Sequence, residues 1–271
     1  TDRIRPGGEW AYYHQTIDGY SAAKLKRYDD ILKIVNGDAA KQTQGEFVRY
    51  LMNLMEKQSE SRTPVLDMLN AKYILFPDSL PGTQYLNKID QVFAGSSNMH
   101  IFKNNTALPR AWFVKQQSQI ASPDSILSIL QGGAFDPSQT ALVETGDALV
   151  SAGDSLSVGS VQQLSHTLHK LEYKLQAPGA GYLVLSEVYY PAGWKAYLDG
   201  KEIPIFATNY ILRGLKIPAG EHRLELVFAP ESYKRSLTLS LLGILLTTLA
   251  VLGGGFLSRK KRLTQEIRPQ D

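Results

Sequence analysis

The chain of 271 residues contains no cysteine, and this excludes disulfide bonds, thiolate metal sites and cysteine nucleophiles. It also has little excess charge, because 29 Lys and Arg residues face 26 Asp and Glu residues. Five of the cations lie after position 258, so residues 1–235 carry 24 cations and 24 anions. A balanced body with a basic tail argues against nucleic acid as the main partner.

The sequence also lacks the common motifs of phosphate, dinucleotide and metal chemistry. It contains no phosphate-binding loop, no dinucleotide fingerprint and no HExxH motif, and its five histidines are scattered. His166 and His169 would form a metal pair only on a helix, because residues three apart on a strand point to opposite faces. We therefore predict no metal site and no cofactor in this chain.

One long uncharged run lies near the C-terminus. Residues 236–258 contain no charged side chain, and at ~1.5 Å per residue a helix of this length crosses a hydrocarbon core of about 30 Å. Two cations precede the run and four follow it at 259–262. The positive-inside rule then predicts that the tail is cytoplasmic and that residues 1–235 lie outside. The alternative is a buried helix of a soluble core.

The start of the sequence predicts that more chain precedes it. Position 1 is not methionine, and no signal-like segment opens the sequence. We therefore expect residues 236–258 to be the last helix of a larger membrane protein. The partners would be the lipid bilayer and the remaining transmembrane helices of that protein, and a single tail anchor is the alternative.

Hydrophobic periodicity predicts helices over a small antiparallel sheet in residues 1–106. Apolar residues recur at helical spacing within 18–57, in the runs AAKLKRYDDILKIV and EFVRYLMNLMEK. Thr63-Pro64 is typical of a helix start. Short strand-like runs follow at 73–76, 92–93 and 99–102.

Strands separated by short turns predict an antiparallel β-sandwich with one short helix in residues 107–235. Residues 166–175 alternate between polar and apolar, and we expect them to form one strand. Asp199-Gly200 is the strongest hairpin signal, and a two-residue turn of this kind needs a positive φ at Gly200.

These patterns together predict the α+β class. The predicted parts are a helical α/β subdomain at 1–106, a β-sandwich subdomain at 107–235, a transmembrane helix at 236–258 and a basic cytoplasmic tail at 259–271.

The densest group of polar and aromatic residues predicts a glycan-binding surface. Sugars stack their C–H faces on aromatic rings, while carboxylate, amide and guanidinium groups take their hydroxyls. In the alternative interpretation Trp194 and Tyr189 pack in the core, Asp199-Gly200 only turns the chain, and Arg213 makes a structural pair. A Trp-Lys loop beside a membrane is also typical of the interface. The candidate residues are Tyr189, Tyr190, Trp194, Asp199, Asn209, Tyr210 and Arg213.

Four segments resemble the closing extracytoplasmic region of the bacterial YfhO-type membrane proteins. The first is YYHQTIDGYSAAKLKRYDDIL at Tyr12–Leu32. VLDMLNAKYIL and LPRAWFV follow in matching order. The most recognisable block is YYPAGWKAYLDGKEIPIFATNYILRGLKIPAGEHRLELVFAP, directly before the apolar run. The resemblance implies a location in the bacterial cytoplasmic membrane.

YfhO-type proteins are similar to the C-superfamily glycosyltransferases, which use polyprenyl-phosphate sugars on the outer face of the membrane. The resemblance places the catalytic acidic residue in an early loop and the lipid-phosphate site among membrane helices, and neither region matches this chain. No residue here, including Asp18, Asp67 and Asp199, therefore inherits a catalytic role, and whether the parent protein is an active enzyme stays open. The alternative is a non-catalytic, membrane-anchored glycan-binding or structural module.

Overall fold

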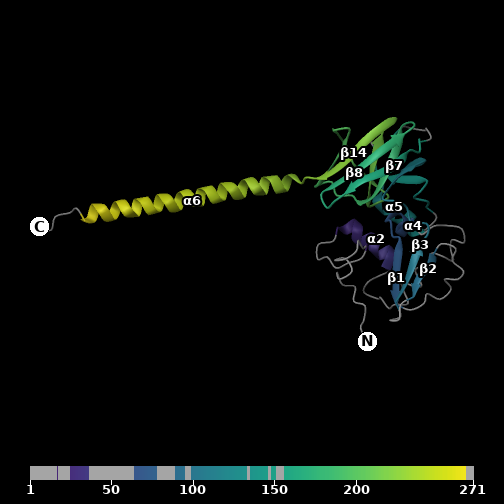
Figure 1. Ribbon diagram of the computed structural model, residues 1–271, viewed down its shortest axis with the longest axis horizontal. Coiled ribbons are helices and arrows are strands. Elements are labelled where there is room, and N and C mark those ends of the chain that lie inside the picture. The colour runs from purple at the N-terminus through teal and green to yellow at the C-terminus, as the bar shows by residue number, and fades with distance from the viewer. Residues whose placement is uncertain are drawn as a thin grey trace.

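The computed structural model describes residues 17, 25–36, 64–77, 89–94, 99–132, 135–145, 148–150 and 156–266. These residues form three β-sheets, short helices and one long C-terminal helix, α6, which extends away from the sheets (Figure 1). The predicted α+β class is confirmed.

The described N-terminal residues form a small antiparallel sheet with helices beside it. Helix α2 (Lys26–Asn36) lies within the predicted helical region, and helix α4 (Pro64–Met68) begins at the predicted proline. The second predicted helical run, at 46–57, lies outside the described residues. The sheet has the order β1-β3-β2. Its strands are β1 Tyr73–Pro77, β2 Ile89–Ala94 and β3 Met99–Asn104.

A six-stranded sheet follows, in the order β4-β9-β13-β12-β6-β5. Its pairs are antiparallel except for β5 and β6, which run parallel. Helix α5 (Pro123–Gly132) connects these two strands, and a parallel pair requires such a crossover. The strands are β4 Ala111–Val114, β5 Gln116–Gln119, β6 Thr140–Val143, β9 Gly181–Val188, β12 Phe206–Thr208 and β13 Leu212–Ile217.

The third sheet has five antiparallel strands in the order β11-β10-β14-β8-β7. It packs against the six-stranded sheet across a shared apolar core, to which Phe113 and Leu183 contribute from one sheet and Tyr173 and Leu224 from the other. This is the two-sheet arrangement that the turn-separated strands predicted. The strands are β7 Ser160–His166, β8 Lys170–Ala177, β10 Trp194–Leu198, β11 Lys201–Ile203 and β14 Gly220–Phe228.

The six-stranded sheet is covered on both faces, which explains its nearly continuous apolar strands. On β9, Leu183 belongs to the core between the two large sheets, whereas Tyr182 and Val184 belong to a second core. This second core also contains Ile31 of α2 and Phe102 of β3. It therefore crosses the predicted boundary between residues 106 and 107, and the division into subdomains stays a prediction.

The prediction of one continuous strand over 166–175 is wrong. The chain turns between β7 and β8, and the two strands pair antiparallel. The Thr167 hydroxyl closes this turn, because it accepts a hydrogen bond from the Lys170 backbone N–H at 3.0 Å. The alternating pattern holds only from Lys170 onward, where Leu171, Tyr173 and Leu175 are buried.

The predicted hairpin at Asp199-Gly200 is confirmed. These residues join β10 and β11 and have φ values of +50° and +82°. Positive φ at both central positions is the signature of a type I′ turn, whose twist matches that of the flanking strands.

Helix α6 (Glu231–Glu266) extends beyond both ends of the predicted span. Its segment Glu231–Gly254 is long and apolar enough to cross a membrane, and none of it is buried against the rest of the chain. A helix that exposes leucine on all sides is suited to a lipid environment. The fold therefore presents a sheet-rich body on one helix that fits a bilayer.

Candidate functional site

The two large sheets have two ends with different chemistry. Strand β14 runs from one end to the other and leads into α6, so we call the end beside α6 the α6 end and the opposite one the far end. The antiparallel register places residues 166–170, 188–194 and 228–230 at the α6 end. It places residues 177–181, 198–201 and 217–221 at the far end.

A pocket of about 150 Å³ lies at the α6 end and contains four of the seven predicted site residues. The link between the two sheets brings them together, since Tyr189 and Tyr190 follow β9 and Trp194 begins β10. Arg213 lies on β13, which pairs with β9. Lys195 and Glu202 also line the pocket, and their charged groups approach to 3.7 Å. The pocket-lining predicted residues are Tyr189, Tyr190, Trp194 and Arg213.

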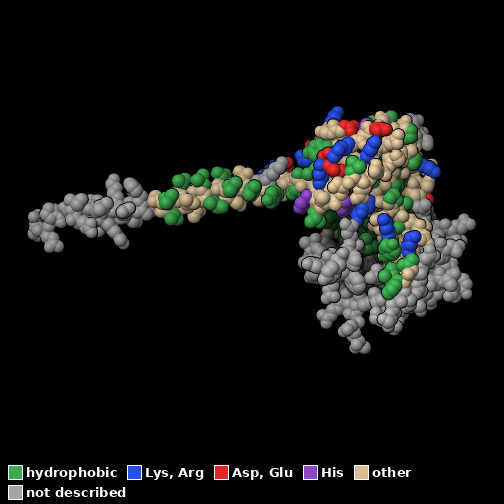
Figure 2. Space-filling model, viewed as in Figure 1, with side chains coloured by type: hydrophobic (Ala, Val, Ile, Leu, Met, Phe, Trp, Pro, Cys, Tyr) green, Lys and Arg blue, Asp and Glu red, His purple; other side chains and the backbone are tan. Residues whose placement is uncertain are grey.

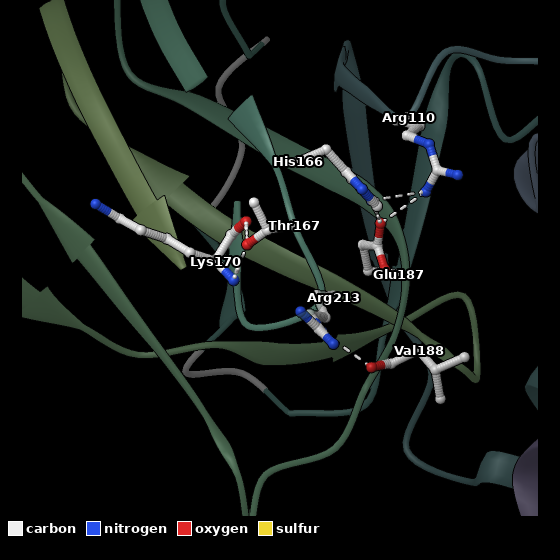
Figure 3. A network of polar contacts seen from close by, with 7 residues as sticks. All are labelled: Arg110, His166, Thr167, Lys170, Glu187, Val188 and Arg213. Atoms are coloured by element: carbon white, nitrogen blue, oxygen red, sulfur yellow. Dashed lines mark hydrogen bonds and ion pairs between the residues drawn. The ribbon is translucent and has the colours of Figure 1, made fainter. Parts of the chain in front are cut away.

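Arg213 is the most unusual residue of this pocket, because it is a cation with only 3% of its surface exposed. The register between β13 and β9 shifts at Leu212/Arg213, and such irregularities re-aim a side chain. The Arg213 Nε donates a hydrogen bond to the Val188 carbonyl at 2.9 Å (Figure 3). Its guanidinium carbon lies 4.2 Å from the centre of the Trp194 ring, in cation–π geometry.

The Arg213 guanidinium keeps unused hydrogen-bonding capacity. Its Nη1 is buried and has no hydrogen-bond partner among the described residues. Burial lowers the pKa of Arg213 to about 10, although the negative charge of Glu187 opposes this shift. Buried donors are almost always paired, so an unpaired guanidinium nitrogen indicates a place for an oxygen-bearing ligand or water.

Further aromatic rings pack against Tyr190 and Trp194 of the pocket. The Phe228 ring lies 5.5 Å from Trp194 and 6.5 Å from Tyr190, and it stacks on His169 at 6.2 Å. We call His169, Tyr190, Trp194 and Phe228 the Phe228 cluster. A side chain at Gly193 would bring its Cβ to 2.2 Å from the Phe228 ring, so this close packing requires glycine.

A charged network adjoins the pocket at the edges of the two large sheets, and Figure 3 shows its members converging. Arg110 Nη1 lies 2.9 Å from Glu187 Oε1, and His166 Nε2 lies 3.3 Å from the same oxygen. The network joins β9 to the end of β7. Sequence reasoning missed Arg110 and Glu187 and considered His166 only as a metal ligand, although a lone glutamate in the apolar run of β9 was a signal that a partner was needed.

A buried tyrosine hydroxyl, that of Tyr173, lies near the pocket. The Tyr173 hydroxyl is buried and has no hydrogen-bond partner among the described residues. Burial raises the pKa of Tyr173 to about 12, and the negative charge of Glu187 contributes in the same direction. Arg213 and Tyr173 thus influence each other's pKa directly, and the charge of Glu187 acts on both.

Asp199 lies apart from the pocket, at the far end. It follows β10, whose five residues at about 3.3 Å each separate it from Trp194 by roughly 16 Å. Its Oδ1 accepts a hydrogen bond from the Arg223 backbone N–H at 2.8 Å, and its Oδ2 lies 2.7 Å from His222 Nδ1. The carboxylate thus ties the β10–β11 turn to the neighbouring strand β14.

Asn209 and Tyr210 are core residues. The Asn209 Oδ1 accepts a hydrogen bond from the Leu142 backbone N–H at 2.8 Å, which ties the segment after β12 to β6. The Tyr210 hydroxyl donates to Asp30 Oδ2 at 2.8 Å and so anchors α2. Their exposed fractions are 0% and 4%, so neither side chain is available at the surface.

The two histidines considered for metal binding have separate surroundings. His166 lies beside Glu187, and His169 stacks on Phe228. Within the described part of the chain, no group of three or more His, Cys, Asp or Glu side chains is placed to hold a metal ion.

Comparison with known proteins supports a membrane protein. Residues 127–240 match the family described as bacterial membrane protein YfhO. The predicted resemblance is confirmed over these residues. The YfhO match runs from α5 into α6 and includes the whole pocket. Neither the curated proteins nor the solved structures contain a match to this chain.

The YfhO match and helix α6 both indicate a membrane protein. The match identifies a membrane-protein family, and α6 is long and apolar enough to cross a bilayer. The chain is therefore a membrane-protein module, and the lipid bilayer is its partner.

Proposed function

We propose that this chain is the extracytoplasmic module of a YfhO-type glycosyltransferase that uses polyprenyl-phosphate sugars at the bacterial cytoplasmic membrane. In this proposal the pocket at the α6 end holds one ring of the glycan that accepts the sugar. The observation that carries the proposal is the buried Arg213, whose Nη1 is unpaired beside the Trp194 ring.

The chemistry of the pocket suits a sugar. A ring can stack its C–H face on Tyr190 or Trp194, while the guanidinium of Arg213, which lines the pocket, supplies a donor for a hydroxyl oxygen. Drug-sized ligands occupy roughly 300–1,000 Å³, so a pocket of about 150 Å³ fits one ring and not a whole oligosaccharide. The remaining rings of the glycan would extend over the surface.

The proposed transfer is divided between this module and membrane-embedded parts of the protein. An acidic residue outside residues 1–271 removes the proton from the acceptor hydroxyl, whose oxygen attacks the anomeric carbon. The bond to the polyprenyl phosphate breaks, and the configuration inverts. This module positions the acceptor, and none of its residues takes part in bond making.

Binding of cell-wall oligosaccharides to the full chain in lipid nanodiscs tests the pocket. Trp194→Ala removes one stacking face, worth roughly 0.5–1.5 kcal/mol, so we expect about a 2- to 12-fold weaker affinity. Arg213→Met removes the donor at similar volume and should also weaken binding. Asp199→Asn, at the far end, is the matched control and should bind like the wild type.

Three results would contradict the proposal. Binding that survives both pocket substitutions in folded protein excludes the pocket. Loss of binding in Asp199→Asn would relocate the site to the far end. Turnover of a polyprenyl-phosphate sugar by this chain alone would show that the catalytic groups lie within residues 1–271.

A structural cap is the second candidate, and the packing of Trp194 on Phe228 favours it. In that case Trp194→Ala lowers the melting temperature and no oligosaccharide binds the wild type. Measuring the melting temperature beside every titration separates the two candidates.

A further inference from the structure

The turn between β7 and β8 carries an exposed leucine, and hydrogen bonds hold the base of this turn. Leu168 has 88% of its surface exposed and stands at the tip of the turn. Thr167 holds the base of the turn, since its backbone N–H donates to the Lys170 carbonyl at 2.8 Å and its hydroxyl accepts from the Lys170 N–H (Figure 3). The leucine is therefore held outward by a fixed turn.

This turn lies directly beside the point where the chain enters α6. The Phe228 backbone N–H donates to the His169 carbonyl at 2.9 Å, and the two rings stack at an interplanar angle of 19°. Only Ala229 and Pro230 separate β14 from α6. The tip of the turn is thus fixed to the base of the helix.

Other apolar and aromatic surface gathers at the same end. Tyr190 is 39% exposed and belongs to the Phe228 cluster, and Tyr233 is 67% exposed on the first turn of α6. Figure 2 shows hydrophobic and histidine side chains together where α6 meets the sheets. The turns of the far end are residues 178–180, Asp199-Gly200 and residues 218–221, and none of them contains a large apolar side chain.

Helix geometry sets the depth that this surface reaches. Five helical residues, 231–235, separate the end of the linker from the uncharged run, a rise of roughly 7.5 Å at 1.5 Å per residue. The headgroup layer on each side of a bilayer is about 5–8 Å thick. The α6 end therefore lies at the level of the headgroups when α6 spans the membrane.

We propose that the Leu168 turn and the exposed edge of the Phe228 cluster contact the headgroup layer of the bilayer that α6 crosses. Aromatic rings prefer this layer, and an adjacent leucine adds apolar area there. The contact holds the body against the membrane at its α6 end. It rests on α6 as a membrane helix and is independent of glycosyl transfer.

The absence of native cysteine allows a clean test with single labelled sites. Leu168→Cys places an environment-sensitive fluorophore at the tip of the turn, and Ala219→Cys places the same fluorophore on an exposed turn of the far end. Both full-chain variants are reconstituted in vesicles of phosphatidylcholine and phosphatidylglycerol, with and without lipids that carry a nitroxide at the headgroup.

The label at 168 should emit at shorter wavelength than the label at 219 and should be quenched by the nitroxide lipids. Equal emission and equal quenching at both sites would overturn the proposal. A blue-shifted label at 168 that nitroxide lipids fail to quench would also overturn it, because this result indicates contact with protein. Leu168 is exposed, so its replacement should leave the melting temperature unchanged, and the melting temperature is the check on folding.

Discussion

The α6 end and the far end of the two large sheets differ in how their charged groups are paired. At the α6 end the Nη1 of Arg213 is buried without a partner among the described residues. At the far end both oxygens of Asp199 are bonded, and Nε2 of His222 is the unpaired buried atom. The far end thus holds a carboxylate paired to β14, whereas the α6 end holds a buried cation beside a pocket.

This difference shows that the hydrogen-bond partners of a polar side chain indicate whether the side chain can bind a ligand. A carboxylate whose two oxygens are both bonded to the neighbouring strand has little to offer a ligand, although Asp and Gly in a polar, aromatic segment look attractive in sequence. A buried cation that lacks one partner costs stability, and such costs persist where the group has another use. The hydrogen-bond partners of Asp199 and Arg213 therefore distinguish the two ends better than the residue types do.

The largest expected effect is at the α6 end, where Arg213→Ala should lower the free energy of unfolding by about 2–4 kcal/mol. It removes the stacking on Trp194 and leaves a cavity, although the cost of burying the charge disappears. Arg213→Met keeps the volume and should cost less than about 1.5 kcal/mol. Chemical unfolding followed by tryptophan fluorescence measures both values. Equal losses in the two variants would show that the charge itself stabilises the fold.

A smaller effect is expected at the far end, where Gly200→Val should cost about 1–3 kcal/mol. A Cβ at Gly200 meets nothing within 4 Å, so the cost comes from the φ of +82° alone. Gly200→Asn is the matched control, because asparagine tolerates positive φ, and it should cost clearly less. If valine and asparagine cost the same, backbone strain is not the cause.

The smallest effect is expected for Asp199→Asn, at about 0.5 kcal/mol or less at pH 7, because the group is exposed to solvent. The Arg223 backbone N–H and then His222 hold the pKa of Asp199 below its usual value of 3.8. A lowered pKa in the folded state gives stability that is present above pH 3.8 and is lost as the pH falls further. The difference from wild type should therefore shrink as the pH falls below 3.8 in acid unfolding curves. A difference that stays constant as the pH falls would show that the charge of Asp199 is not its source.

Much of the fold could be predicted from local pattern. The start of α4, the type I′ turn at Asp199-Gly200 and the apolar helix depend on residues close together in sequence, so their signals survive without tertiary information. The break at 167–169 was missed although Leu168 is out of phase with Leu171, Tyr173 and Leu175 and would face the other side of a continuous strand. The hydrogen bonds of Thr167 that turn the chain there are visible only in the structure.

The candidate site was predicted in part for a similar reason. Tyr189, Tyr190, Trp194 and Arg213 line one pocket, although β9 and β13 pair at a distance of more than twenty positions along the chain. Asp199 has the right chemistry but lies at the other end of β10. Asn209 and Tyr210 look like surface polar groups in sequence, yet the partners that bury them come from β6 and α2.

The sequence by itself determined the membrane helix, the turn conformation and the strand-rich body, because each follows from the period or backbone preference of a short segment. Only the tertiary structure decided which polar groups are paired. The partners of Arg213, Glu187 and Tyr210 lie 25, 77 and 180 positions away. Pairing over such distances depends on strand order and register, and these are settled by burying the two apolar cores together.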